Sequence, residues 1–167
     1  IQEPLFRLAM ANAAANGLQD RLSVILGDFN DNYRRFAKVA NIFCNPPFFK
    51  AGQGRVSRDA GVRLARFEIT LTLDGLLRCS AAILAPAGSL SLILPFSRHD
   101  ELLSCAAAQG LFPEKIRLIR PFADAPADRY LARLGNSAVP CREEPALVIF
   151  AARGVYGTEM ARILSGT

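Results

Sequence analysis

Residues 40–52 read ANIFCNPPFFKAG, and the character of this segment changes abruptly at Asn45. A short apolar run, Ile42 to Cys44, is followed by an amide side chain, two prolines and two phenylalanines. Short apolar runs of this kind are typical of buried strands in parallel sheets, and proline ends the hydrogen-bonded ladder. We therefore expect a buried strand that carries an amide, a rigid carbonyl group and an aromatic ring at its carboxyl end.

The flanking sequence alternates between helical and strand patterns. The tract 123–144 is rich in Pro, Asp, Arg and Gly and is predicted to be a loop. The alternation predicts an α/β fold with a mostly parallel, doubly wound sheet and an antiparallel strand at one edge, all within one globular domain over 1–167. Helices are expected over 3–17, 31–38, 62–84 (with a break near 70–74), 98–110 and 158–166, and strands over 22–28, 41–44, 89–95, 114–122 and 145–152.

Three turn segments follow expected strands and should gather at one edge of this sheet. They are Gly27-Asp28, the run from Asn45 to Phe48, and Pro95-Phe96. In open α/β sheets, ligands bind outside the carboxyl ends of the strands. These segments therefore lie where a binding site is expected.

The Asn45 to Phe48 segment can hold a planar amino group. The prolines fix φ and remove two backbone donors, so nearby carbonyl groups stay unpaired. The Asn45 amide oxygen and an adjacent carbonyl can together accept both hydrogens of an amine, which aims its lone pair at an electrophile. Phe48 offers a flat face for stacking, worth about 1–3 kcal/mol per base. The alternative is a proline-terminated strand whose phenylalanines are core residues.

The segment also resembles a known motif, in which Asp, Asn or Ser precedes two prolines and an aromatic residue in S-adenosylmethionine-dependent amino methyltransferases. The block 1–18 is similar to the segment that follows the second strand in these enzymes. The blocks 65–95, 116–131 and 144–164 resemble one subgroup, the tRNA (adenine-N6)-methyltransferases acting on valine tRNA. The resemblance covers essentially the whole chain. It implies a Rossmann-like class I methyltransferase fold, S-adenosylmethionine as cofactor, tRNA as partner and methylation of an adenine N6.

The resemblance also assigns roles to residues. Asn45 and the Pro46 carbonyl would bind the target amine, with Asn45 also near the methyl donor, and Phe48 would stack on the target ring. Ile1 would pack on the adenine of the donor, and Asp28, with Phe29 beside it, would contact that adenine. Asp28 could instead cap a helix. One departure is Asn41, where the family often has an acidic residue.

Two family features have no match in the chain: the glycine-rich donor loop and the acidic residue that binds the donor ribose. Both are expected before Ile1. The resemblance therefore implies a catalytic domain that is incomplete at its amino terminus and lacks a central strand. The 167 residues alone are expected to be inactive and to bind S-adenosylmethionine poorly.

Basic residues cluster in the loop after Phe48, beside the candidate site. A loop of this composition can contact RNA phosphates, and the alternative is a solvated loop without partners. A second basic group either extends this footprint or is ordinary surface. The first group contains Lys50, Arg55, Arg58, Arg63 and Arg66, and the second contains Lys115, Arg117, Arg120, Arg129 and Arg133.

Composition limits the remaining possibilities. The apolar runs are too short for a membrane span, which needs about 20 residues. The four cysteines are widely spaced and there is one histidine, His99, so we expect inert thiols, no metal site and a cytoplasmic protein. His99 is expected to start a helix.

Two other functions stay open at this point. One is a release-factor glutamine methyltransferase, which uses a similar motif to hold an amide nitrogen but usually has Tyr after the prolines. The other is a non-catalytic domain that only binds RNA. The net charge of +5 is compatible with a polyanionic partner but does not choose between them.

Overall fold

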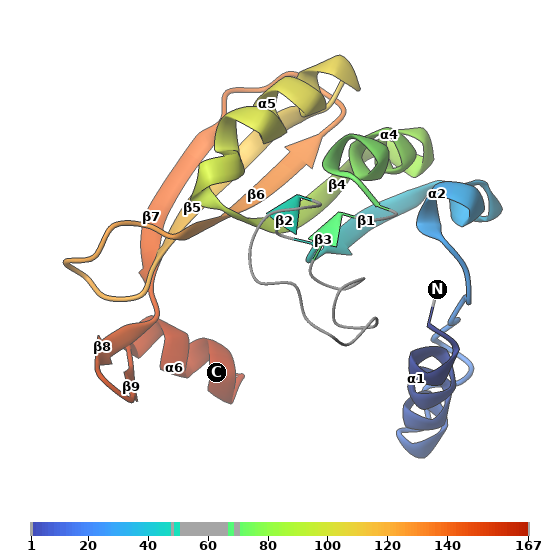
Figure 1. Cartoon of the computed structure of the whole chain (residues 1–167), viewed down its shortest axis with the longest axis horizontal. Coiled ribbons are helices and arrows are strands. Elements are labelled where there is room, and N and C mark those ends of the chain that lie inside the picture. The colour runs from blue at the N-terminus through green and yellow to red at the C-terminus, as the bar shows by residue number, and fades with distance from the viewer. Residues whose placement is uncertain (1, 48, 51–66, 69–70, 167) are drawn as a thin grey trace.

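A five-stranded sheet forms the centre of the molecule, in the order β1-β4-β6-β5-β7 (Figure 1). The computed structural model describes residues 2–47, 49–50, 67–68 and 71–166. Strands β1, β4, β5 and β7 run in one direction, because β1 pairs parallel with β4, β7 pairs parallel with β5, and both β4 and β5 pair antiparallel with β6. The bounds are β1 Val39–Cys44, β4 Leu84–Pro95, β5 Phe112–Arg120, β6 Arg129–Gly135 and β7 Arg142–Val148.

The mostly parallel α/β fold is therefore confirmed, but the position of the antiparallel strand differs from the prediction. That strand is β6, and it lies in the middle of the sheet between β4 and β5. It comes from the tract 123–144 that was predicted to be a loop. The prediction was wrong because the turn-forming residues of this tract flank the strand on both sides, while RYLARLG itself alternates exposed and buried side chains along its length.

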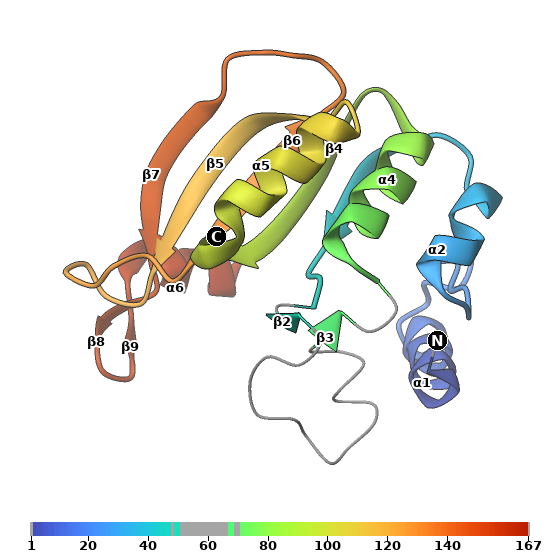
Figure 2. The same cartoon turned by 45° about the horizontal axis from the view of Figure 1, so that its top comes forward.

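Two helices, α4 (Leu73–Ile83) and α5 (His99–Ala108), cover one face of the sheet (Figure 2). The period-2 alternation of β4 and β6 points their larger apolar side chains at these helices. The resulting core contains leucines from both helices and the four leucines of β4, together with Tyr130 of β6. Its fully buried members include Leu77, Leu90, Leu94, Leu102, Tyr130 and Leu134.

The expected helix over 62–84 is confirmed only in its second half. Helix α4 begins at Leu73, where the Thr72 side chain accepts a hydrogen bond from the Gly75 amide at 3.1 Å. Before it, the backbone of β3 (Phe67–Glu68) pairs parallel with that of β2 (Phe49–Lys50). The break therefore lies at the predicted place, but part of the preceding segment is strand rather than helix.

The amino-terminal region forms helix α1 (Glu3–Ala15), as predicted, but no strand over residues 22–28. A strand needs a neighbour for its backbone groups. Within the described residues this segment lies beside α1 instead, across a hollow of about 330 Å³ lined by Phe6 and Ile25 among others. Leu22 and Leu26 stay exposed. The strand prediction is thus wrong for this structure, although the apolar pattern that prompted it is present.

The carboxyl-terminal segment forms a small unit at the end of β7. Strands β8 (Phe150–Ala152) and β9 (Val155–Tyr156) make a hairpin, and helix α6 (Thr158–Ser165) ends at Gly166 in the left-handed conformation. Phe150 stacks on Tyr156 at a ring separation of 5.4 Å. The predicted helices at 98–110 and 158–166 are confirmed. None of the helices described is both long and apolar enough to cross a membrane.

Candidate active site at the carboxyl ends of β1 and β4

The Asn45-Pro46-Pro47 segment leaves the sheet directly beside the end of β4. Strands β1 and β4 are parallel neighbours, with Cys44 in register with Leu92, so both chains emerge at the same edge. This is the edge at which α/β sheets bind ligands. The predicted placement of the motif is therefore confirmed up to Pro47, while Phe48 lies outside the described residues.

Asn45 is exposed, whereas Pro46 behind it is buried. Within the part of the chain that the structure describes, the Asn45 carboxamide makes no hydrogen bond, which leaves its oxygen available to an incoming amine. Asn45 also lines a cavity of about 510 Å³ on the face of the sheet away from α4 and α5. The neighbouring Phe43 side chain is 80% exposed on that face, and β1 has a neighbouring strand on one side only among the described residues.

Arg98 reaches the motif from the adjacent strand connection. It belongs to the short 3-10 helix Phe96–Arg98 (η2) that follows β4, and it is 5% exposed. Its Nη1 donates to the Pro47 carbonyl oxygen at 3.3 Å. Its Nε and Nη2 donate to the two carboxylate oxygens of Glu101 at 3.2 and 3.0 Å. This guanidinium therefore ties η2, helix α5 and the proline segment together.

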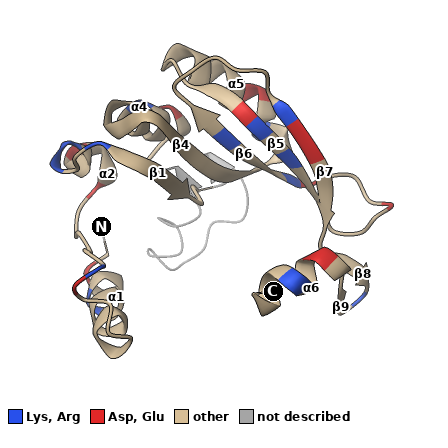
Figure 3. Cartoon of the chain, turned by 180° about the vertical axis from the view of Figure 1, so that it is seen from behind, with Lys and Arg blue, Asp and Glu red and all other residues tan. Residues whose placement is uncertain are grey.

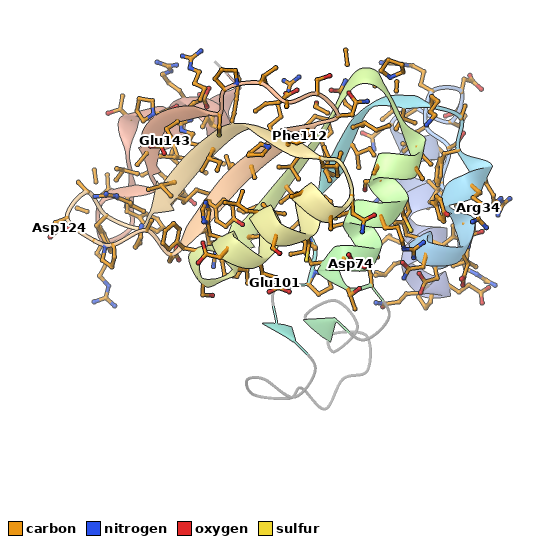
Figure 4. All side chains as sticks on the ribbon, turned by 90° about the horizontal axis from the view of Figure 1, so that it is seen from above. Arg34, Asp74, Glu101, Phe112, Asp124 and Glu143 are labelled. Carbon is orange, nitrogen blue, oxygen red and sulfur yellow. The ribbon has the colours of Figure 1, made fainter. Side chains whose placement is uncertain are left out.

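Strand β6 and the residue before it hold η2 in place through two hydrogen bonds. The Phe96 amide donates to the Asp128 carbonyl at 3.0 Å, and the Tyr130 hydroxyl donates to the Arg98 carbonyl at 3.5 Å. Burial raises the pKa of Tyr130, so its hydroxyl stays protonated and remains a donor. The Phe96 ring stacks on His99 at 5.8 Å. Figure 4 shows Glu101 and Asp74 along the edge of the molecule beyond which β2 and β3 lie.

Neither Arg98 nor Tyr130 was among the predicted site residues. Arg98 stands in SRHDELL, where an arginine before a helix is ordinary in sequence. Tyr130 stands in the tract that was predicted to be a loop. The signal that could have found Tyr130 was the alternation in RYLARLG, which places every second residue of a strand on one face. No local pattern of this kind marks Arg98.

Asp28 is the N-cap of helix α2 (Phe29–Asn32), which is the alternative that the sequence left open for it. Its Oδ1 accepts from the Asn30 amide at 2.9 Å. Phe29 is half-buried and lies 6.5 Å from the rings of Tyr33 and Phe36. These contacts hold the turn in place, and contact of Asp28 and Phe29 with a donor adenine stays a prediction.

Several predicted site residues lie outside the described residues, so their roles stay predictions as well. For Lys50 in β2 the structure describes the backbone only. The others are Ile1, Phe48, Arg55, Arg58, Arg63 and Arg66.

The second basic group is largely matched by acidic partners, which favours ordinary surface over an RNA footprint (Figure 3). Lys115 lies 3.5 Å from Glu144, and Arg133 donates to Glu114 at 2.9 Å. Arg117 donates to Glu159 at 2.6 Å. Paired charges attract phosphates less than unpaired ones, because the acidic partner repels the same anion.

The cysteines are free thiols and behave as predicted. Burial raises the pKa of Cys44 to about 11, and burial also raises the pKa of Cys79, so both stay protonated and unreactive near neutral pH. No cluster of three His, Cys, Asp or Glu side chains that could hold a metal ion occurs among the described residues. His99 is the first residue of α5, as predicted.

Several curated proteins similar to this chain share one name, tRNA1(Val) (adenine(37)-N6)-methyltransferase. The Parabacteroides distasonis protein is 34% identical over 122 residues, covering 73% of this chain and 51% of the relative. The Aeromonas hydrophila subsp. hydrophila protein is 33% identical over 159 residues, covering 95% of this chain and 65% of the relative. The chain thus spans between about half and two thirds of the length of these relatives. No family model matches the chain.

Two solved structures have a fold similar to that of this chain. A predicted O-methyltransferase from Agrobacterium tumefaciens superposes with a TM-score of 0.69 at 16% identity, covering 99% of this chain and 74% of the other. TrmN from Thermus thermophilus gives a TM-score of 0.53 at 22% identity, covering 80% and 34%. At these identities the likeness concerns the fold alone. The chain thus has the fold of the class I methyltransferases and is a homologue, at 30–34% identity, of proteins named tRNA1(Val) (adenine(37)-N6)-methyltransferase.

Proposed function

We propose that this protein methylates N6 of adenine 37 in valine tRNA, using S-adenosylmethionine as the methyl donor. The observation that carries the proposal is the Asn45 carboxamide, which stands exposed and without a hydrogen-bond partner among the described residues at the carboxyl end of β1. Pro46 follows it and is buried. The name shared by the curated relatives supplies the substrate.

The residues of this chain would act mainly by positioning. The Asn45 oxygen and the Pro46 carbonyl would accept the two hydrogens of the adenine amine, which turns its lone pair outward. Phe48 would stack on the adenine ring after that base has left its stack in the RNA. No strong base is needed, since the proton can leave once the new N–C bond has formed. Alignment of the amine would supply most of the acceleration.

S-adenosylmethionine would supply the methyl group. Asp28 fits a place beside its adenine, because a carboxylate oriented by the Asn30 amide can accept from an exocyclic amine. Phe29 would add an aromatic surface there, Ile1 would pack on the ring, and Asn45 would lie between donor and target.

The tRNA would be held by the basic loop after Phe48. Lys50, Arg55, Arg58 and Arg63 would contact backbone phosphates, so that binding weakens as salt increases. A tRNA substrate also favours a cytoplasmic location. The names of the curated relatives favour tRNA over the two alternatives, glutamine methylation of a release factor and a non-catalytic RNA-binding role.

The test uses the protein as its gene encodes it, with isotopically labelled S-adenosylmethionine. Total tRNA from a strain that lacks the gene is offered in one reaction and a release factor in another, and the digested products are identified by mass spectrometry. We expect the label in N6-methyladenosine. Label in glutamine, or in neither product, would contradict the proposal.

A further inference from the structure

We infer that Arg98 is a positioning residue for the Asn45-Pro46-Pro47 segment, and that Glu101 sets the orientation of its guanidinium. The inference rests on the proposed function, because the Pro46 carbonyl matters for activity only if it receives the target amine. The contact that carries it is the hydrogen bond from Arg98 Nη1 to the Pro47 carbonyl oxygen, at 3.3 Å.

This contact lies next to the group that needs to be oriented. Peptide planes are rigid, and proline fixes its own φ. One soft torsion, ψ of Pro47, therefore separates the plane of the Pro46 carbonyl from the plane of the Pro47 carbonyl. A donor that holds the Pro47 oxygen thus restricts the direction in which the Pro46 oxygen points.

The arginine is itself held firmly. Its side chain is 6% exposed, and Glu101 accepts from both Nε and Nη2, so the planar guanidinium has one orientation. The Tyr130 and Asp128 contacts fix the backbone of η2 around it. A buried guanidinium needs such partners, since losing one leaves a buried charge uncompensated. The Pro47 carbonyl therefore rests on a rigid support rather than on a mobile surface side chain.

The position of Arg98 also predicts which kinetic constant it affects. It touches neither Asp28 nor any other residue assigned to the donor adenine, among the contacts described. A misplacement of about 1 Å at a reacting group can lower a rate by about 100-fold. We therefore expect Arg98 to act on kcat and to leave the affinity for S-adenosylmethionine nearly unchanged.

Arg117 provides a matched control, because it makes the same kinds of contact and, although it lines the same cavity as Asn45, none of its described contacts reaches the Asn45-Pro46-Pro47 segment. Its Nε donates to the Pro145 carbonyl at 2.8 Å, and its Nη2 donates to Glu159 at 2.6 Å. These contacts join β5 to β7 and α6, at the opposite edge of the sheet from β1. An arginine that only stabilises the fold should behave like Arg117.

The experiment compares Arg98→Met, Arg98→Lys, Glu101→Gln and Arg117→Met in the protein as its gene encodes it. Steady-state methyl transfer to tRNA gives kcat and KM, calorimetric titration gives the donor affinity, and thermal unfolding gives the midpoint. For Arg98→Met we expect kcat to fall by about 10- to 100-fold with donor affinity within about twofold. Arg98→Lys and Glu101→Gln should lie between Arg98→Met and the wild type. Guanidinium at concentrations far below denaturing ones should restore part of the Arg98→Met activity, and Arg117→Met should keep the wild-type kcat.

Two results would overturn the inference. One is a wild-type kcat in Arg98→Met. The other is a loss of kcat and donor affinity together, in proportion to the fall in unfolding midpoint and without rescue, as for a residue that only stabilises the fold. Crystal structures of the wild type and Arg98→Met separate this inference from the proposed function. If the wild type does not methylate tRNA, the proposed function fails, and displacement or retention of the Asn45-Pro46-Pro47 segment in Arg98→Met still decides whether Arg98 positions it.

Discussion

Arg98 and Arg117 each donate to a proline carbonyl and to a glutamate, yet their surroundings differ. The Arg98 side chain is 6% exposed and its glutamate 30% exposed, whereas the values for Arg117 and Glu159 are 18% and 45%. Arg98 joins the connection after β4 to the segment after β1, and both lie at the carboxyl edge of the sheet. Arg117 joins β5 to the carboxyl-terminal helix.

The difference teaches that the same contacts have different consequences in different places. At Arg117 the contacted proline, Pro145, lies within β7 at an irregularity of the ladder, but the pairs of Glu144 and Leu147 with β5 hold the backbone on both sides of it. At Arg98 the contacted carbonyl lies beyond the end of β1, and Pro47 belongs to no ladder among the residues that the structure describes. A side-chain donor therefore adds orientation at Pro47, while at Pro145 it adds mainly stability.

The largest expected effect is on stability, from Tyr130→Ala. Tyr130 is fully buried between β6 and the helices and also bonds the Arg98 carbonyl. Its removal leaves a cavity in the core, and we expect the free energy of unfolding to fall by about 3–5 kcal/mol in urea titrations. The control is Leu131→Ala, the next residue on the opposite face, which is 38% exposed and should have a clearly smaller effect. Equal losses of unfolding free energy in the two variants would contradict the burial of the Tyr130 face of β6 and the exposure of the Leu131 face.

The next largest effect concerns the reaction, from Asn45→Ala. Removing an amide that contacts the reacting amine should lower methyl transfer by about 100-fold or more, by analogy with loss of one polar group that stabilises a transition state. The affinity for S-adenosylmethionine, measured by titration calorimetry, should stay close to that of the wild type.

Asn136→Ala is the matched control for this variant, because that carboxamide donates to the Ala85 carbonyl at 2.9 Å near the other end of β4. It should leave methyl transfer unchanged. Equal loss of rate and donor affinity in Asn45→Ala would mean that Asn45 is structural.

A smaller effect is expected from Arg117→Met. The variant loses the link between β5 and α6, and its unfolding midpoint in calorimetry should fall by about 2–4 °C. Its kcat should not change, because the described contacts of Arg117 are with Pro145 and Glu159 and none reaches the Asn45-Pro46-Pro47 segment. A loss of kcat comparable to that of Arg98→Met would remove the contrast between the two arginines.

The smallest effect is a pH dependence at Glu159. The hydrogen bond from Arg117 lowers the pKa of this carboxyl below its ordinary value of 4.5. A lowered pKa in the folded state stabilises the protein above the pKa of the unfolded state, and this contribution disappears as the pH falls through the folded-state value. We expect the stability of the wild type to fall more steeply below pH 4.5 than that of Glu159→Gln. Identical pH profiles would contradict the lowered pKa.

Much of the fold and part of the site could be predicted locally. Helix α5 begins at His99, and α6 ends before Gly166. Both boundaries could be predicted, because the residues that signal a helix end are close neighbours in the sequence. Strand β1 was predicted from the apolar run Ile42 to Cys44, but it begins earlier, at Val39, and none of its residues is buried, so the prediction of a buried strand was wrong. The motif at Asn45 could still be placed at the ligand-binding edge, since the carboxyl end of a parallel strand defines that edge.

The missed elements depend on neighbours that are distant in sequence. Residues 22–28 have the composition of a strand, but composition does not supply the second strand that a ladder requires. Strand β6 was hidden among turn-forming residues, and its pairing with β4 and β5 decides that it is a strand. Secondary structure at such places is set by tertiary contacts.

The sequence by itself determined the chemistry available at the motif, because the residue types of Asn45, Pro46 and Pro47 fix which groups can accept hydrogen bonds and which torsions are rigid. Only the tertiary structure decided what holds that chemistry in place. Arg98 lies 51 positions from Pro47 in sequence, and Tyr130 lies 32 positions from Arg98. Their contacts exist because parallel pairing of β1 with β4 and antiparallel pairing of β4 with β6 bring three separate segments to one edge, and local sequence patterns carry no information about such long-range pairing.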